Sequence, residues 1–136
     1  MLVDGAGVPL SLVVTGANRH DVSQLEAVLD SIVIERPDTF EYPQHLCLDK
    51  GYTGEPALEI VVLRGFIPHI KSRGEEKTEG ECNSEHKARR WVVEVTHSWI
   101  NRFRTLLVRF EKLASSYLGL LMFACAFIAF RNADVI

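Results

Sequence analysis

The stretch that decides the fold is His45-Leu-Cys-Leu-Asp-Lys-Gly-Tyr52. Its first four residues form a short apolar run, typical of a buried β-strand, and the run ends at a polar turn that begins with Asp49. A helical segment at Glu55–Arg64 follows, Gly65 closes it, and a second short apolar run covers Phe66–Ile70. This order of strand, helix and strand predicts an α/β layer in which the sheet and the helices cover one another.

Two weaker signals precede this stretch. Met1–Val3 and Val8–Thr15 flank a turn sequence at Asp4–Gly7, so the chain is predicted to open with a β-hairpin. Apolar residues recur at helical spacing over Val22–Ile34, and Ser23–Glu26 near its start fits a capping box. We therefore predict an amphipathic helix between the hairpin and the buried strand.

Two helical segments are predicted in the last third of the chain. The first runs from Glu85 to Lys112, and the second covers Ser115–Arg131. Within the second, the apolar run Tyr117–Phe130 is 14 residues long, whereas a membrane span needs about 20 residues. The length therefore favours a buried helix, and no membrane partner is expected.

The composition is that of a folded, soluble protein with room for one domain, since 47% of the 136 residues are hydrophobic and 24% are charged. The three cysteines, Cys47, Cys82 and Cys125, are odd in number and widely spaced. This pattern argues against a disulfide framework and for a reducing, cytoplasmic location. Cys82 and His86 lack the second ligand pair of a structural zinc site, so zinc is not expected.

Charge is distributed unevenly along the chain. Residues 1–86 carry a net charge of −8, whereas residues 87–136 carry +5. Such an asymmetry suits a protein that collects metal ions at one place and contacts nucleic-acid phosphate at another. On charge alone, however, a basic stretch is more often a solvated helix face.

Two carboxylates stand out as candidate site residues. Asp49 directly follows a buried strand, at the sheet edge where open α/β folds bind ligands, although Asp is also a common turn cap there. Glu94 lies on the polar side of the predicted long helix, between Arg90 and Asn101, and an exposed Arg90–Glu94 pair explains the same pattern. The opposite, apolar side of this helix holds Val92, Trp99, Phe103 and Phe110.

Carboxylates from separate elements are what a divalent-metal phosphoryl-transfer site uses. Mg²⁺ prefers oxygen ligands, and two such ions about 4 Å apart can activate an attacking hydroxyl and stabilise the leaving oxygen. A third acidic ligand usually completes the site. Asp4 and Asp21 are the early loop candidates for it, but Asp4 lies in a turn sequence where Asp is common for conformational reasons.

Three strings of residues resemble one known family. They are TGANRHD at residues 15–21, DKGY at residues 49–52 and RWVVEVTHSWINRFR at residues 90–104. In this order, over nearly the whole chain, they resemble DDE transposases of the insertion sequence 5 group within the insertion sequence 4-like superfamily. The resemblance implies a ribonuclease-H-like mixed sheet flanked by helices. It also implies metal-dependent DNA hydrolysis and strand transfer during transposition, with Mg²⁺ as cofactor and Mn²⁺ as its substitute.

The resemblance assigns roles to individual residues. Asp49 matches the second catalytic Asp of the family and Glu94 matches the catalytic Glu, so both would ligate metal. Arg90 matches the Arg four residues before that Glu, whereas Lys87 and Asn101 stand where the signature commonly has Tyr and Lys. The resulting candidates for contact with DNA are Arg90, Asn101, Arg102 and Arg104. Trp91 is a further candidate for base stacking, and packing at the edge of the core explains it equally.

No residue of the chain matches the family's first catalytic Asp, whose strand would precede Met1. We therefore expect residues 1–136 to form a partial catalytic domain that lacks its first strand and cleaves little or no DNA by itself. The alternatives are a non-catalytic fragment that binds DNA or inhibits full-length transposase, and a remnant that does not accumulate as folded protein. By family analogy, the complete protein would act on transposon ends and target DNA as a dimer.

Overall fold

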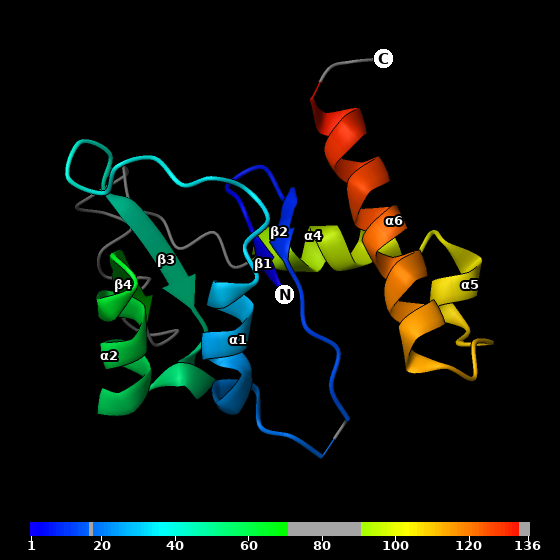
Figure 1. The fold of residues 1–136 in the computed structure, drawn as a ribbon, viewed down its shortest axis with the longest axis horizontal. Coiled ribbons are helices and arrows are strands. Elements are labelled where there is room, and N and C mark those ends of the chain that lie inside the picture. Colours follow the sequence, from blue (N-terminus) through cyan, green and yellow to red (C-terminus); the bar gives the residue numbers. More distant parts are fainter. Residues whose placement is uncertain (17, 71–90, 134–136) are drawn as a thin grey trace. The chain divides into compact units, whose positions relative to one another are not determined.

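The computed structural model describes residues 1–16, 18–70 and 91–133, and its strands and helices form two compact units (Figure 1). The first unit comprises Met1–Val14 and Trp91–Ile136, and the second comprises Thr15–Arg90. The predicted α/β class is confirmed, because both units combine strands with helices. In the described residues the strands pair as two separate two-stranded sheets, and a larger mixed sheet of the ribonuclease-H type stays a prediction.

The second unit is built around a parallel pair of strands. β3 (Gln44–Leu48) pairs with β4 (Phe66–Ile70), in register from Gln44 opposite Phe66 to Leu48 opposite Ile70. The helix α2 (Glu55–Leu63) connects them, as a parallel pair requires. Gly65, at φ +74°, ends the helical segment in the left-handed region that favours glycine. The predicted strand–helix–strand order is therefore confirmed.

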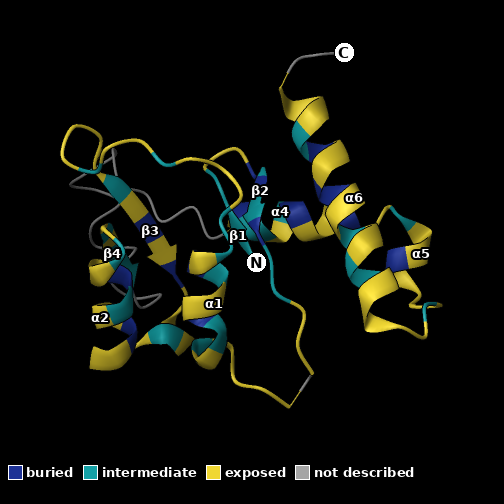
Figure 2. Ribbon diagram, in the orientation of Figure 1, coloured by how far each residue is buried: buried dark blue, intermediate teal, exposed yellow. Residues whose placement is uncertain are grey.

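Side chains of β3 alternate between the core and the surface. Leu46 and Leu48 are buried, while the alternate residues His45 and Cys47 are exposed (Figure 2). The imidazoles of His45 and His69 are joined on the exposed face by a hydrogen bond of 2.7 Å across the sheet. The buried core residues of this unit are Leu25, Leu29, Leu46, Leu48, Ala57 and Val61.

The helix predicted over Val22–Ile34 is shorter than expected. A 3-10 turn, η1 (Asp21–Gln24), leads into α1 (Leu25–Asp30). The predicted capping box is wrong, because the Ser23 hydroxyl donates to the His20 carbonyl (2.7 Å) and neither element has a side-chain cap at its start.

The Glu26 carboxylate binds Arg64 and not the start of the helix. The Arg64 guanidinium donates to Glu26 (2.8 Å) and, through two nitrogens, to Asp30 (2.7 and 3.1 Å). The Arg64 carbonyl in turn accepts a hydrogen bond from Arg36 (2.7 Å), whose guanidinium lies over the Phe66 ring. The end of α2 is thereby tied to α1 and to the chain before β3.

The first unit opens with the predicted hairpin. β1 (Leu2–Val3) and β2 (Pro9–Ser11) are antiparallel, and β2 is shorter than the predicted Val8–Thr15. Asp4 holds the turn, because its Oδ1 accepts from the backbone N–H groups of Ala6 and Val8 (2.8 Å each). The conformational interpretation of Asp4 is therefore confirmed.

The long helix predicted up to Lys112 is wrong beyond Ile100. α4 (Trp91–Ile100) ends there, and a turn leads to the short helix α5 (Arg104–Leu107). Phe103 is extended (φ −81°, ψ 97°), and its ring meets the Phe127 ring edge to face, with 6.0 Å between centroids. Phe110, predicted on the apolar side of a continuous helix, is exposed. The predicted start of the helix at Glu85 lies outside the described residues.

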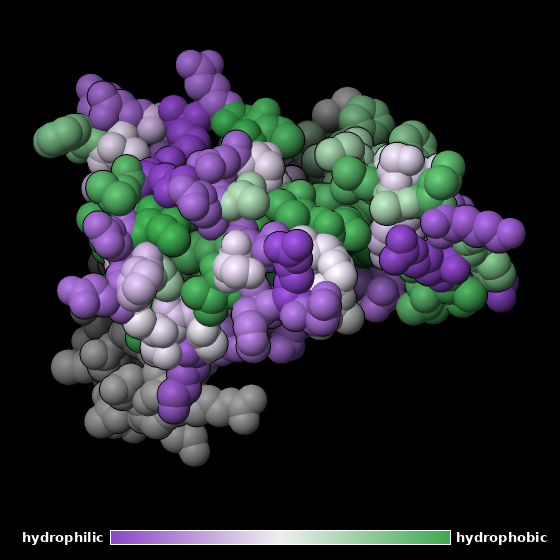
Figure 3. Space-filling model, turned by 60° about the horizontal axis from the view of Figure 1, so that its bottom comes forward, coloured by the Kyte–Doolittle hydropathy of each residue, from purple (hydrophilic) through white to green (hydrophobic). Residues whose placement is uncertain are grey.

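The last helix, α6 (Ala114–Asn132), matches its predicted position. Its buried residues join α4 and α5 in one core, made of Ile100, Leu106, Ala124, Cys125 and Ile128. The predicted burial of the whole apolar run is wrong, because Met122, Phe123 and Phe130 are exposed, and Figure 3 shows hydrophobic side chains at the surface in this region. Among the described helices, α6 is long and apolar enough to cross a membrane by length and composition.

Candidate functional site

Asp49 stands where β3 ends. It precedes the 3-10 turn η2 (Lys50–Tyr52), and its Oδ1 accepts a hydrogen bond of 2.7 Å from the backbone N–H of Lys50. Its carbonyl accepts from the N–H of Tyr52 (3.0 Å). The carboxylate is exposed, so it combines a fixed position at the carboxyl end of a strand with access to ligands.

A second carboxylate lies close to this turn. η1, which begins with Asp21, packs against η2, which ends with Tyr52. Burial raises the pKa of the Tyr52 phenol, and the negative charges of Asp21 and Asp49 raise it further. The raised pKa keeps the phenol protonated at neutral pH. The sequence analysis gives Asp21 only as a candidate for the third acidic ligand. In the structure, the packing of η1 against η2 brings it near the turn that follows Asp49.

Glu94 is exposed on α4, as the helical pattern predicts. The opposite face buries Val92, Thr96 and Ile100. The Thr96 hydroxyl, fully buried, donates to the Gly7 carbonyl of the hairpin turn (2.7 Å) and also lies 3.1 Å from the Val92 carbonyl. This bond joins the buried face of the helix to the hairpin, and Glu94 lies on the opposite, exposed face. The predicted partner Arg90 lies outside the described residues.

The two candidate metal ligands belong to different units, Asp49 to the second and Glu94 to the first. Their donor chemistry suits Mg²⁺, because both offer exposed carboxylate oxygens and the ion prefers such ligands. Over residues 1–16, 18–70 and 91–133, no three His, Cys, Asp or Glu side chains form a group that could hold a metal. A metal ion shared by the two carboxylates therefore stays a prediction.

The basic candidates lie just beyond α4. Asn101 and Arg102 form the turn that ends this helix, Arg104 begins α5, and all three side chains are exposed. Of the two tryptophans, Trp99 is half-buried against the core of its unit, as predicted, whereas Trp91 is exposed at the start of α4. Exposure makes Trp91 accessible to a stacking partner.

Asp49, Glu94 and the basic turn after α4 all lie within one matched segment. The chain belongs to the family of transposase DDE domains, whose model matches residues 46–131, from β3 to the end of α6. A putative transposase for insertion sequence element IS402 from Burkholderia cepacia is 34% identical over 140 residues. That alignment covers 98% of this chain and 64% of the relative, so the chain spans about two thirds of that protein's length. No solved structure gives a significant match.

Proposed function

We propose that this chain is the C-terminal catalytic region of an insertion-sequence transposase of the insertion sequence 5 group. In this proposal, Asp49 and Glu94 are the second and third carboxylates of a ribonuclease-H-like DDE site. The observation that carries it is the position of Asp49. An exposed carboxylate, fixed by a backbone hydrogen bond, directly follows a parallel strand whose Leu46 and Leu48 are buried, inside the matched family segment.

Mg²⁺, with Mn²⁺ as a substitute, is the cofactor that these ligands suit. A bound divalent ion would neutralise charge on a DNA phosphate and lower the pKa of a coordinated water or hydroxyl. Asp49 and Glu94 would supply oxygen ligands to it. Asp21 is a further acidic group in the same unit as Asp49, and the charges of both raise the pKa of the Tyr52 phenol.

DNA is the proposed partner, and the basic residues after α4 are its proposed contacts. Arg102 and Arg104 are exposed and lie within ten residues of Glu94 along the chain, with Asn101 beside them. Guanidinium groups at such a place bind phosphate and give an affinity that falls steeply with salt. Arg90 is proposed for the same role from its sequence position.

A non-catalytic role is the second candidate. The match to the relative covers 64% of its length, and the described residues contain two candidate metal ligands in separate units. A chain of this kind could bind DNA through its basic turn, or pair with a full-length transposase and inhibit it. In that case metal binding at Asp49 would be dispensable.

Paramagnetic Mn²⁺ tests the site directly, because it broadens NMR signals near the ion even when binding is weak. We expect Mn²⁺ to broaden backbone signals around both Asp49 and Glu94. Asp49→Asn should remove the broadening at both places, since both carboxylates would share the ion. Glu59→Gln, which changes an exposed carboxylate on α2, is the matched control and should leave it intact.

The same samples separate the two candidate functions. We expect no robust Mg²⁺-dependent nicking of supercoiled DNA by this chain alone, and nicking that Asp49→Ala abolishes would contradict that expectation. Broadening confined to one carboxylate would contradict a shared metal site. If DNA binding persists without metal and survives Glu94→Gln while no broadening is seen, the non-catalytic role is correct.

A further inference from the structure

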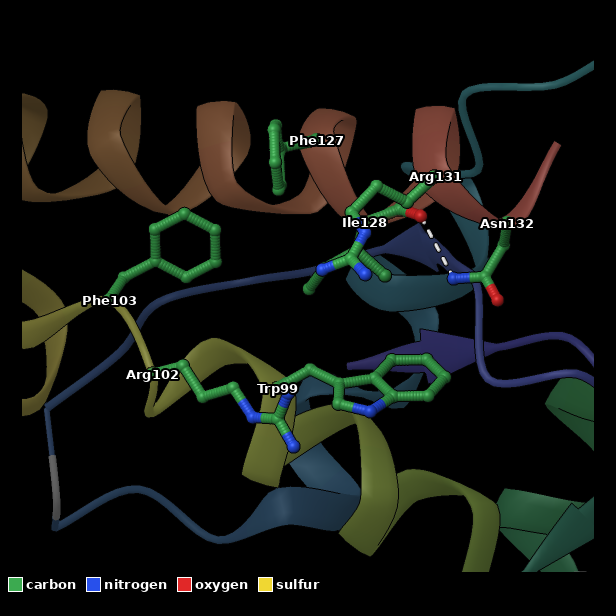
Figure 4. Close-up of a pocket in the computed structure, with 7 residues that line it drawn as sticks. All are labelled: Trp99, Arg102, Phe103, Phe127, Ile128, Arg131 and Asn132. Carbon is green, nitrogen blue, oxygen red and sulfur yellow. Dashed lines mark hydrogen bonds between the residues drawn. The ribbon is translucent and has the colours of Figure 1, made fainter. Parts of the chain in front are cut away.

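A pocket of about 290 Å³ lies between the C-terminal end of α4 and the last turns of α6, wholly within the first unit. Figure 4 shows its lining side chains arriving from both helices and from the turn that joins α4 to α5. This volume is at the lower end of the range of about 300–1,000 Å³ that is usual for small-ligand sites. The pocket therefore has room for one small group.

Two guanidinium groups line this pocket. Arg102 comes from the turn after α4 and Arg131 from the last turn of α6, and both side chains are exposed. In the described part of the chain, neither guanidinium forms an ion pair with a carboxylate. The ion pairs found there are those of Arg64 with Glu26 and Asp30. Among the described residues that line the pocket, none is acidic. Two like charges at one concave site favour an anionic ligand.

Aromatic rings form the rest of the wall. Trp99, Phe103 and Phe127 line the same pocket, with the two phenylalanine rings edge to face. Trp99 and Phe103 are half-buried and pack on the core, so their rings are held in place before any ligand arrives. Phe127 remains 43% exposed on α6 and offers ring surface to a planar group.

We propose that this pocket binds one unstacked nucleotide, with its phosphate on Arg102 and Arg131 and its base against the aromatic wall. Guanidinium groups recognise phosphate oxygens, and stacking on aromatic rings holds a base without regard to its sequence. A carboxylate-bearing peptide would use the arginines but not the ring faces, so the combination favours a nucleotide. The pocket would hold DNA next to α4, which carries the proposed metal ligand Glu94, so this proposal rests on the proposed function.

Deoxyadenosine monophosphate is the first probe, because it carries one base and one phosphate and needs no duplex. We expect it to quench tryptophan fluorescence through Trp99. Arg131→Gln and Phe127→Leu should each weaken its binding about tenfold, as expected for the loss of a charged phosphate contact or of a stacking ring. Phe127→Leu keeps an apolar side chain on α6, so we expect the fold to be retained.

Duplex DNA is the second probe, in three forms: fully paired, with one unpaired internal adenine, and with a single-stranded end. We expect the last two to bind about tenfold more tightly than the first, because their bases are free to stack. The ratio between the two tighter forms tells a flipped internal base from a frayed end. Lys112→Gln and Phe123→Leu are the matched controls, since both side chains are exposed and lie outside the pocket.

The outcomes separate this inference from the proposed function. Loss of nucleotide binding in both pocket variants but in neither control supports the pocket. Equal binding by all variants overturns it, as does inorganic phosphate that binds as tightly as the mononucleotide, because the base would then add nothing to an anion site. If the mononucleotide binds the pocket but Mn²⁺ does not broaden signals at Asp49 and Glu94, the pocket stands and the metal site falls.

Discussion

β3 and α4 each carry one proposed metal-binding carboxylate, and they position it by different means. Asp49 follows the last residue of β3, so its place depends on where the strand stops, and the Lys50 N–H then fixes it. Glu94 lies inside α4, so its direction depends on how the helix is rotated about its axis. Thr96 holds the buried face of that helix to the hairpin through its bond to the Gly7 carbonyl.

The comparison shows which contacts each carboxylate depends on. β3 is held by apolar burial on one face, through Leu46 and Leu48, and by its pairing with β4. α4 adds to its apolar face a buried hydroxyl bonded to a residue 89 positions away. Asp49 should therefore respond to the loss of apolar volume, and Glu94 to the loss of a single hydrogen bond.

Truncation of a buried β3 side chain should have the largest effect on the free energy of unfolding. Leu46 is 5% exposed, and Leu46→Ala is expected to lower the free energy of unfolding by about 2–5 kcal/mol, because it removes buried methyl groups and leaves a cavity. Amide hydrogen exchange of β3 and β4 measures this loss of stability. Cys47→Ala, on the exposed face of the same strand, should change stability by about 0.5 kcal/mol or less. Equal effects of the two variants would mean that burial of one face does not hold β3.

Removal of the α4 hydroxyl should have an intermediate effect. Thr96→Val keeps the side-chain shape but leaves the buried Gly7 carbonyl without its donor, so we expect a loss of about 1–3 kcal/mol. Thermal unfolding followed by the fluorescence of Trp99 measures it. Ser98→Ala, on the exposed side of α4, is the control. A loss no larger than that of the control would show that the apolar face alone sets the helix rotation.

The ion pair at the end of α2 should give the smallest, pH-dependent effect. The hydrogen bond from Arg64 lowers the pKa of Asp30 in the folded chain. Because the folded pKa lies below the unfolded one, this contact stabilises the fold above the ordinary carboxyl pKa and loses its effect as the pH falls through the folded value. Arg64→Gln should therefore be less stable than the wild type at pH 6, and the difference should shrink toward about pH 3.

Denaturant titrations at several pH values check this prediction. Lys50→Gln changes an exposed cation in the same unit and should leave the pH dependence as it is in the wild type. The difference in unfolding free energy between Arg64→Gln and the wild type could also stay constant from pH 6 to pH 3. That result would mean that Arg64 stabilises the fold through packing of its stem and not through its charge.

Local patterns were enough to predict the elements around Asp49. A short apolar run that stops at an acidic turn, and a helix closed by glycine, depend on neighbouring residues, and β3, α2 and β4 lie where predicted. The outward direction of Glu94 was also predictable, because helical spacing separates it from Val92 and Ile100. Whether the two carboxylates share a metal ion stays a prediction.

The wrong predictions involve contacts between distant residues. The capping box was wrong because Glu26 bonds to Arg64, 38 residues away. The long helix was wrong because Phe103 leaves it to pack against Phe127 of α6. The closeness of Asp21 to the Asp49 turn likewise depends on the packing of η1 against η2. No spacing rule within a single element could have found these three contacts.

The thiol of Cys125 can report how often the core of the first unit opens. It lies on the buried side of α6, in the core of this unit, and burial raises its pKa. An alkylating reagent should therefore modify it only in molecules whose helices have momentarily separated, so the labelling rate measures how often this core opens. Cys47, exposed on β3, would react in every molecule and serve as an internal standard, once Cys82 is replaced by serine.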